Sequence, residues 1–553
     1  MKETRDILTL FEALNSHEVF TPPRIARDML SLLPKSIWSD PRIRILDPCT
    51  KTGVFLRESF FLLYDGLQGA GLFKADDGET YDLSDHQQRI NHILKNMLYG
   101  IATSELTGYM SRRTLYGVME ANIRKEDAAF DSFVRSESFN RWSDNEKYHF
   151  LTRNTFNTYF DPLIFSSESH AGFEHEGNIF YPVSEVTRLA ESHGVVLEDT
   201  YFPFVDDRTK HGKILDIKGG NMFFDVIIGN PPYQTDTGGS GRQAKPIYQE
   251  FVNQAKSLKP RYLSMITPAR WYAGGFGLDS YRESMMNDRS LRYLVDFESA
   301  TSVFPGVDVA GGICYFLIDR DYDGDCTVIT NRNGERTEQV RPLNEFDIIV
   351  RDSRAISILR KVLASASARD HGVLSPKVSP IRPFGLPTNY KPESSGIPCW
   401  FIQKYGRQYA DPASFTDRYG LKDKWKVLIP KAPIAGQTDF SKPIRIYHEK
   451  NVLLARPGEI CTESYIVAGA FDNELSAIHF RQYLFTKLAR FLILLTIISQ
   501  DVNKKNFRFL PDLGDYSQKV DDAILVEMWG ISESEWSYIN ERIKPVIQGK
   551  DGE

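Results

Sequence analysis

Short apolar runs alternate with amphipathic segments along the first half of the chain. The apolar runs have the length and composition of buried strands and lie at residues 43–46, 97–101, 224–228 and 262–267. The segments between them place apolar side chains at helical spacing, as at residues 54–58, 106–115 and 247–256. Strands that alternate with helices predict an α/β fold with a mostly parallel, doubly wound sheet. Such a sheet binds its ligands beyond the carboxyl ends of its strands.

The second half of the chain loses this rhythm after the acidic turn at residues 319–325. Residues 363–396 are rich in Pro and Ser, which favour loops. We therefore predict one domain over residues 1–350, with an insertion at about 130–215 of unreadable role, and a second, α+β domain over 351–553. The run at 491–495 is apolar on every helical face and is predicted to lie in the core of the second domain.

The net charge of the whole chain conceals one basic segment. The 553 residues carry 67 Lys and Arg against 73 Asp and Glu, and 41% of them are hydrophobic, which suits a folded soluble protein. Residues 351–460 nevertheless hold 19 Lys and Arg against 9 Asp and Glu, a net charge of +10. This segment is therefore where contact with nucleic acid is expected.

Cysteine usage and apolar stretches limit the location of the protein. The five cysteines lie far apart and form no Cys-x-x-Cys pair, so reduced thiols and no zinc site are expected. The charged N-terminus leads into no apolar signal core, and the longest apolar stretch, residues 491–499, is about half of a membrane span. We therefore expect a cytoplasmic protein without membrane contact.

The most specific chemical signal is Asn230-Pro231-Pro232-Tyr233 at the end of a predicted strand. An exocyclic amine conjugated to a heterocycle is a poor nucleophile, so an enzyme that alkylates it must orient and polarise its N–H groups. Asn230 offers a side-chain carbonyl and Pro231 a backbone carbonyl as acceptors. The two prolines stiffen the turn, and Tyr233 offers a ring for stacking. A plain turn is the competing interpretation.

A second candidate is the strand-to-helix turn at residues 47–53. Its small residues and Gly53 let backbone amides at a helix N-terminus approach a ligand. Many α/β proteins turn in this way for packing reasons alone. The turn gains weight only together with the motif at Asn230.

These segments resemble the amino-group DNA methyltransferases, specifically the TaqI-like adenine-N6 methylases of type II restriction-modification systems. The similarity begins with an N-terminal cofactor motif at residues 19–29, an S-adenosylmethionine loop at 47–57 and the catalytic motif at 230–233. Their order is that of the family's gamma arrangement. Further family-like stretches lie at 266–271, 303–306, 457–463 and 498–502, so the resemblance covers most of the chain.

The resemblance implies a Rossmann-like methyltransferase core, S-adenosylmethionine as cofactor and double-stranded DNA as partner, with a separate restriction endonuclease as a candidate second partner. It assigns cofactor contacts to Phe20, Thr21, Pro22, Asp47, Pro48, Gly53 and Phe55. Thr21 is expected near the methionine carboxylate and Asp47 at the amino group. Asn230 and Pro231 would accept from the adenine N6 amine of a flipped-out base, Pro232 would stiffen the turn, and Tyr233 would stack on the base. The transfer needs no metal.

Three positions fit the family pattern less well. Ala102 stands where the family often has an acid for the ribose; Glu105 is a candidate substitute, although the helix dipole explains a first-turn acid equally well. Asp216 is a candidate for the acid that contacts the cofactor's adenine, and a solvated loop acid is the alternative. Phe304 is either a second aromatic residue for the flipped base or plain core packing.

The basic segment is predicted to be the target-recognition region. Residues 400–407 and 422–426 interleave cations with aromatic residues, a pattern typical of segments that contact phosphates and stack on bases. The alternative interpretation is a charged face that only contacts solvent. Because the core begins near Val19, we expect no nuclease domain before it and no cleavage activity.

Two other functions stay open from the sequence. One is a methyltransferase that acts on RNA or on a protein glutamine, although such enzymes are usually shorter. The other is a catalytically silent DNA-binding subunit, which Ala102 favours and the intact motif at Asn230 opposes. Cytosine-N4 chemistry needs a similar turn, and by resemblance Asn rather than Ser at position 230 favours adenine.

Overall fold

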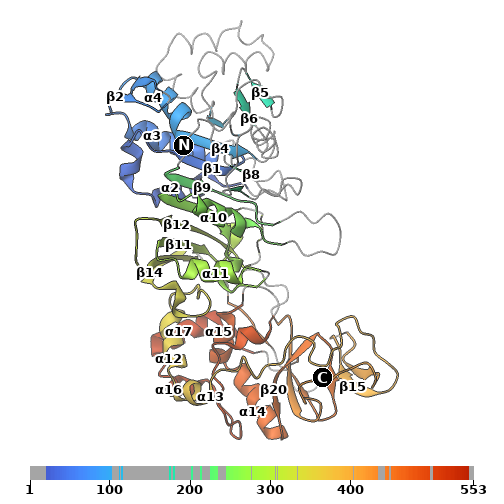
Figure 1. Ribbon diagram of the computed structural model, residues 1–553. Coiled ribbons are helices and arrows are strands. Elements are labelled where there is room, and N and C mark those ends of the chain that lie inside the picture. Colours follow the sequence, from blue (N-terminus) through green and yellow to red (C-terminus); the bar gives the residue numbers. More distant parts are fainter. Residues whose placement is uncertain are drawn as a thin grey trace, which may run out of the picture. The chain divides into compact units, whose positions relative to one another are not determined.

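The computed structural model describes residues 20–102, 224–234, 245–497 and 502–546, apart from single positions and short gaps at 77, 276, 305–306, 308, 310, 333, 403, 434–442 and 448–449, together with short pieces at 111, 114–115, 173–175, 178–180, 201–202 and 212–213. The chain divides into two compact units (Figure 1). The first comprises Met1–Ile329 with Gln339–Leu343, and the second Thr330–Glu338 with Asn344–Glu553.

An eight-stranded sheet forms the centre of the fold (Figure 1). Its parallel half pairs β4 with β1, β1 with β9 and β9 with β10, while β12 runs antiparallel to both β10 and β11. This arrangement confirms the predicted α/β fold and adds an antiparallel half. In spatial order the strands are β14 (Glu335–Arg341), β13 (Cys326–Arg332), β11 (Leu291–Phe297), β12 (Ile313–Asp319), β10 (Tyr262–Pro268), β9 (Val226–Gly229), β1 (Ile45–Thr50) and β4 (Leu98–Ala102).

Helices cover both faces of this sheet. The helices α2 (Pro23–Ser31) and α3 (Val54–Gly66) share one core with Ile266 of β10. The helix α10 (Tyr248–Ser257) packs on β10, and its Tyr248 lies close to Cys314, the strand partner of Thr267. Because Ile266 and Thr267 are neighbours along β10, they point to opposite faces. The first unit is therefore doubly wound, as the sequence predicted.

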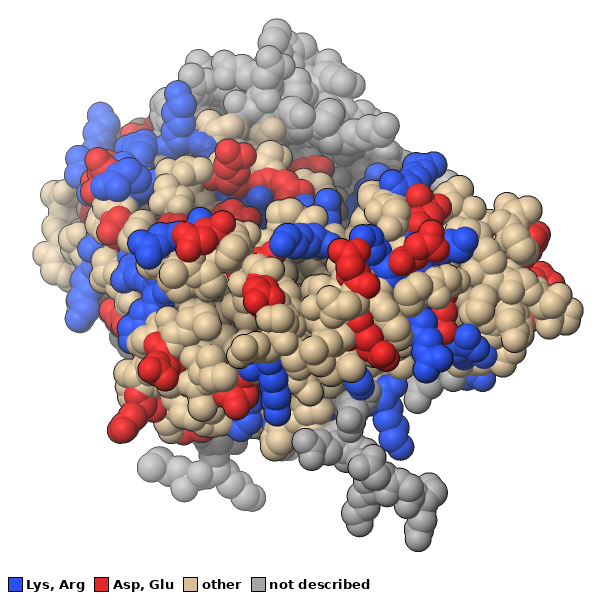
Figure 2. All heavy atoms as spheres, turned by 90° about the horizontal axis from the view of Figure 1, so that it is seen from below, with Lys and Arg blue, Asp and Glu red and all other residues tan. Residues whose placement is uncertain are grey.

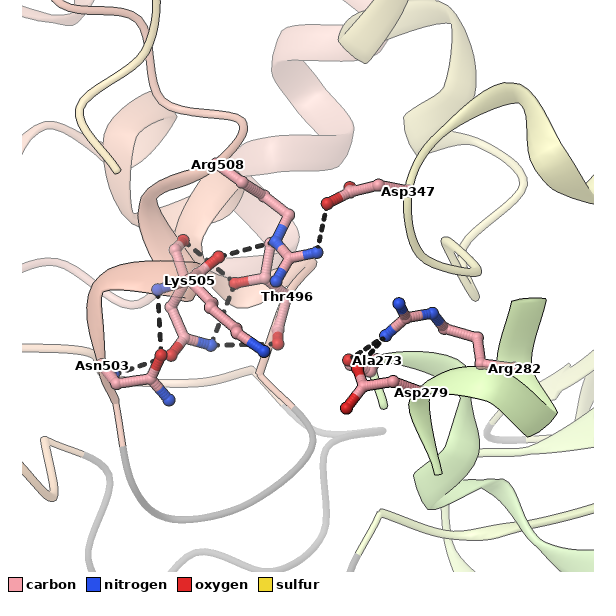
Figure 3. Close-up of polar contacts among 9 residues, drawn as sticks. Ala273, Asp279, Arg282, Asp347, Thr496, Asn503, Lys505 and Arg508 are labelled. Atoms are coloured by element: carbon pink, nitrogen blue, oxygen red, sulfur yellow. Dashed lines mark hydrogen bonds and ion pairs between the residues drawn. The ribbon is translucent and has the colours of Figure 1, made fainter. Parts of the chain in front are cut away.

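The remaining elements of the first unit are short. They are the helices α4 (His86–His92) and α11 (Asp279–Met286) and the strand pairs β2 (Leu72–Lys74) with β3 (Thr80–Asp82), β5 (Phe173–His175) with β6 (Asn178–Phe180), and β7 (Tyr201–Phe202) with β8 (Gly212–Lys213). Near α11, the Arg282 guanidinium donates to the Ala273 carbonyl at 2.8 Å and to the Asp279 carboxylate at 3.0 Å (Figure 3).

The second unit combines two small sheets with helices, in agreement with the α+β expectation. One sheet has the order β16 (Arg407–Ala410), β15 (Ile397–Trp400), β19 (Ile460–Cys461), and the other β18 (Leu453–Ala455), β17 (Trp425–Pro430), β20 (Tyr465–Phe471). The helices are α12 (Ala355–Leu363), α13 (Ala366–His371), α14 (Glu474–Phe485), α15 (Lys487–Leu494), α16 (Asp522–Met528) and α17 (Glu533–Arg542). The apolar run at 491–494 lies buried in α15, as predicted.

A turn after α15 is fixed by side-chain hydrogen bonds (Figure 3). The buried Asn506 amide donates to the Thr496 carbonyl at 3.0 Å, and its oxygen accepts from the Asn503 backbone amide at 2.8 Å. The Arg508 guanidinium donates to Asp347 at 2.5 Å and to the Lys505 carbonyl at 2.7 Å. These bonds hold residues 503–508 in place, and the side chain of Lys505 is exposed.

All five cysteines are free and buried. Within the described part of the chain, no helix is long and apolar enough to cross a bilayer.

Candidate active site

The first candidate residues lie at the carboxyl end of β1. The strand is buried throughout and runs through Asp47 and Pro48 to Thr50. It pairs with β9 at Ile45 and Leu46, and with β4 at Ile45–Asp47 and again at Thr50, with an irregular register in between. Asp47 is 2% exposed, and its Oδ1 accepts a hydrogen bond from the Cys49 amide at 3.1 Å. Burial raises the pKa of Asp47 to about 7, although the bond from Cys49 acts in the other direction.

The turn that follows β1 ends at Gly53, which precedes the first residue of α3. Gly53 has φ +73° and no side chain to cap the helix. A Cβ at this position would lie 2.7 Å from the Ser111 hydroxyl, and Ser111 in turn is 3.0 Å from the Thr50 hydroxyl. Only glycine satisfies both conditions. The first amides of α3 therefore have no side-chain cap, and backbone amides of this kind can bind a ligand.

The motif Asn230 to Tyr233 follows β9 directly, beside this turn. The register pairs Ile45 with Val226 and Leu46 with Ile227, so Asp47 on β1 lies level with the last residues of β9. A Cβ on Gly229 would lie 3.0 Å from Asp47 Oδ1 and 3.3 Å from Pro48 Cδ. Gly229 thus allows the Asp47 strand and the Asn230 turn to approach closely.

Asn230 is held by the N-terminal segment. Its Nδ2 donates to the Thr21 hydroxyl at 3.1 Å, and both residues are nearly buried, at 4% and 5% exposed. Thr21 precedes Pro22, whose carbonyl accepts from the Ile25 amide in the first turn of α2. The structure therefore brings Thr21, Asp47 and Asn230 together from segments that are far apart in sequence.

Tyr233 lies at the end of the turn with its ring half buried against the core of the first unit. Its hydroxyl is buried and has no hydrogen-bond partner among the described residues, as is also true of the Tyr248 hydroxyl nearby. Burial raises the pKa of Tyr233, and the neighbouring Cys314 and Tyr248 act in the same direction. Tyr233 is thus a neutral ring at the edge of the site. Burial also raises the pKa of the Cys314 thiol to about 11, so this cysteine is not a nucleophile.

The other predicted residues differ in their placement. Phe20 is 8% exposed, and Pro22 directly precedes α2. Phe55 and Phe304 are each 2% exposed and belong to the same core against which Tyr233 packs. Glu105 and Asp216 lie outside the described residues. Ala102 pairs with Thr50 at the carboxyl end of β4, so its backbone borders the site.

The sequence analysis missed two residues that shape the site. Gly229 directly precedes the motif, and its position after a predicted strand was a usable signal of close backbone approach. Ser111 had no signal in the sequence, since its part depends on a contact with Gly53 that only the folded chain creates.

Comparisons with known proteins identify relatives of this chain. The Eco57I restriction-modification methylase family matches residues 96–304, which contain β9 and the Asn230 motif. An uncharacterized adenine-specific methylase of Mycoplasma pneumoniae (strain ATCC 29342 / M129 / Subtype 1) is 30% identical over 346 residues, which are 61% of this chain and 75% of the relative.

Solved structures of restriction-modification proteins are more distant. The DrdV–DNA complex is 12% identical with a TM-score of 0.43 and covers 92% of this chain. The type I methyltransferase subunit from Streptococcus thermophilus is 9% identical with a TM-score of 0.31 and covers 61%. The chain spans only 58% and 52% of the length of these two proteins. By its match to three quarters of the Mycoplasma relative, this chain belongs to the family of adenine-specific methylases.

Proposed function

We propose that the protein transfers a methyl group from S-adenosylmethionine to the N6 amine of a flipped-out adenine in double-stranded DNA, as the modification enzyme of a restriction-modification system. The observation that carries the proposal is the contact of the Asn230 turn with the Asp47 strand through Gly229. It puts an amine-polarising turn next to a turn suited to the cofactor. The family and its Eco57I-type members support the same reaction.

The residues around Asp47 fit the amino-acid part of S-adenosylmethionine. A buried carboxylate whose pKa is raised to about 7 gains a matching cation when an ammonium group binds beside it. The uncapped amides at the start of α3 suit a carboxylate. Asp47 would thus hold the amino group and the turn at Gly53 the carboxylate. Bound there, the cofactor supplies a methyl group activated by its positive sulfur.

The acceptor base would be held by the Asn230 turn. The Asn230 side-chain oxygen and the Pro231 carbonyl accept from the two N6 hydrogens, which increases the electron density on the nitrogen. The bond from Asn230 Nδ2 to the Thr21 hydroxyl holds the side chain of Asn230 in place, and in this orientation its Oδ1 would act as the acceptor for the base. The half-buried ring of Tyr233 offers a face for stacking. Catalysis then rests on alignment and on polarisation of the amine.

Transfer of labelled methyl from S-adenosylmethionine to unmodified genomic DNA tests this proposal. We expect the label in N6-methyladenine after digestion to nucleosides, and its loss in Asn230→Ala. The control Asn91→Ala removes a half-buried amide of the same unit, which accepts a hydrogen bond from Gln87 on the same helix, and should keep full activity. Label in RNA or protein, with none in DNA, would contradict the proposal, as would full activity of Asn230→Ala.

A further inference from the structure

The second unit carries a β-hairpin that its sequence alone does not separate from the rest of the basic segment. The strands β15 and β16 pair antiparallel, with Trp400 opposite Arg407, and β16 is the edge strand of its sheet. The turn closes with a hydrogen bond from the Phe401 amide to the Gly406 carbonyl at 2.9 Å. In Figure 1, β15 lies at the opposite end of the second unit from α12 and α16.

The base of the hairpin is held by one buried carboxylate. Glu459, 5% exposed, accepts from the Trp400 indole and from the Arg407 guanidinium, both at 2.9 Å. Burial alone would raise the pKa of Glu459, but the bonds from Trp400, the Arg456 amide and Arg407 keep it below its usual value. Phe401 is 1% exposed and stacks on Tyr390, with ring centroids 6.1 Å apart. The hairpin is therefore anchored at its base.

The tip presents a group of exposed side chains of particular types. Ile402, Tyr405 and Tyr409 are 40%, 39% and 38% exposed, although large apolar side chains are normally scattered singly on a surface. Lys404 and Gln408 are exposed beside them, and the Lys404 ammonium lies 4.7 Å from the centre of the Tyr405 ring. Residues 397–410 contain no Asp or Glu. The tip thus combines a cation, aromatic rings and an amide, and its acidic neighbour is the exposed Glu393, which is bridged to Tyr409.

The other aromatic-basic stretch, residues 422–426, is used by the fold. The side chain of Lys426 is buried, and its ammonium donates to the carbonyls of Lys422, Lys424 and Arg456 at 2.6–3.0 Å. Lys424 pairs with Asp472. Lys426 cannot contact a phosphate, so the prediction for this stretch is wrong at that residue. Of the two stretches, the hairpin is the one that is exposed.

On the face that Figure 2 shows, Lys and Arg side chains are interspersed with Asp and Glu rather than gathered into one large patch. On this face, recognition of a polyanion would therefore depend on local groups. Since an ordered two-stranded ribbon fits the major groove of DNA, and Lys and Gln pair with the edges of guanine and adenine, the chemistry of the tip matches a DNA groove.

We propose that the hairpin at residues 397–410 enters the major groove of DNA and contributes to the choice of methylation site, with Lys404 and Gln408 at base edges and Tyr405 and Tyr409 against the backbone. This inference rests on the proposed function, because it makes DNA the partner. The anchoring by Glu459 fixes the direction of the tip, and an ordered tip loses little conformational freedom on binding.

The test compares Lys404→Ala and Gln408→Ala with the parent protein. Lys404 is exposed and its ammonium lies over the Tyr405 ring, so its removal should leave the fold intact; Gln408 also donates to the Tyr405 carbonyl, and melting temperatures check this variant. The control is Lys519→Ala, which removes an exposed cation from the same unit. Sequencing of DNA methylated by the parent gives the site, and fluorescence anisotropy measures binding to a labelled duplex with that site and to a scrambled one.

We expect each tip variant to bind the specific duplex about 5- to 150-fold more weakly, as the loss of a base contact does. The control and the affinity for S-adenosylmethionine should stay unchanged. If the parent methylates DNA while both tip variants bind and methylate the same site within twofold, the inference is wrong, and the hairpin serves another partner such as a protein. If the parent methylates no DNA, labelled genomic fragments replace the site duplex; weaker binding of these fragments by both tip variants would then keep the DNA contact of the hairpin and overturn the proposed function. A parent that neither binds nor methylates DNA contradicts both.

Discussion

Replacement of Thr21 by valine tests whether the N-terminal segment orients Asn230. The Thr21 hydroxyl accepts from Asn230 Nδ2 at 3.1 Å, and the two residues are 5% and 4% exposed. Valine keeps the shape of threonine and removes the acceptor, so the amide loses this bond in a place that water reaches poorly. Such a loss costs about 1–3 kcal/mol. If this free-energy cost raises the barrier of the methyl-transfer step, the transfer rate decreases by about 5- to 150-fold.

The assay is single-turnover transfer of labelled methyl at saturating cofactor, with the enzyme in excess over a duplex that contains the site. Product release then does not enter the rate. We expect Thr21→Val to lower this rate as calculated and to change the dissociation constant of S-adenosylmethionine by less than about twofold. Thr21→Ser keeps a hydroxyl and should stay within about threefold of the parent.

A double variant separates this role from a direct contact with the cofactor. In an Asn230→Ala background the partner of Thr21 is already gone, so Thr21→Val should not lower the remaining rate further. The resemblance to the methylase family instead expects Thr21 near the methionine carboxylate. A tenfold weaker cofactor affinity with an unchanged single-turnover rate would support that placement and refute the reasoning from the Asn230 bond.

Three further predictions concern the same site and the second unit. Gly229→Ala puts a Cβ 3.0 Å from Asp47 Oδ1, so it should weaken cofactor binding and lower the free energy of unfolding by about 1–3 kcal/mol. The control Gly69→Ala, whose Cβ has no neighbour within 4 Å, should change neither quantity. Calorimetry measures the cofactor binding, and denaturant unfolding measures the stability. Asp47 has a pKa of about 7 and would bind the cofactor's ammonium group as a carboxylate, so the affinity for S-adenosylmethionine should rise about eightfold from pH 6 to pH 7.5. Asp47→Asn should remove this rise. Equal affinity of the parent at both pH values would contradict the prediction. Lys426→Met should destabilise the protein by roughly 2–4 kcal/mol, since three carbonyls lose a charged donor, while folded protein keeps its DNA affinity in anisotropy measurements.

The fold was predictable where the strands are short, apolar and parallel. The runs at 224–228 and 262–267 correspond to β9 and β10, and the run at 97–101 to β4. The extension of β1 through Pro48 to Thr50 was not predicted, because a proline after Asp47 favours a turn, whereas the chain rejoins β4 at Thr50. The position of β12, antiparallel between β10 and β11, likewise depends on the whole sheet and not on a local pattern.

The candidate site was predictable as to its residues, and less so as to their contacts. The motif at Asn230 and the turn at Gly53 have local signatures, and parallel strands bring their carboxyl ends together. The bond from Asn230 to Thr21 spans 209 positions and leaves no trace in the pattern. The same holds for the basic segment, where residues 400–407 and 422–426 look alike in sequence and only burial distinguishes the exposed Lys404 from the buried Lys426.

The strand order determines which residues of the site are neighbours. Because β9 lies beside β1 in parallel register, Asp47 and Gly229 are neighbours across a pair of backbones, and Asn230 follows at once. The proposed cofactor and base positions therefore lie at the carboxyl ends of two adjacent buried strands rather than on separate loops. The pairing of the two strands fixes these positions, so the ligands need not order them. Methyl transfer to a weak amine depends on such fixed alignment more than on acid or base catalysis, so the register of β1 and β9 is itself part of the proposed catalytic apparatus.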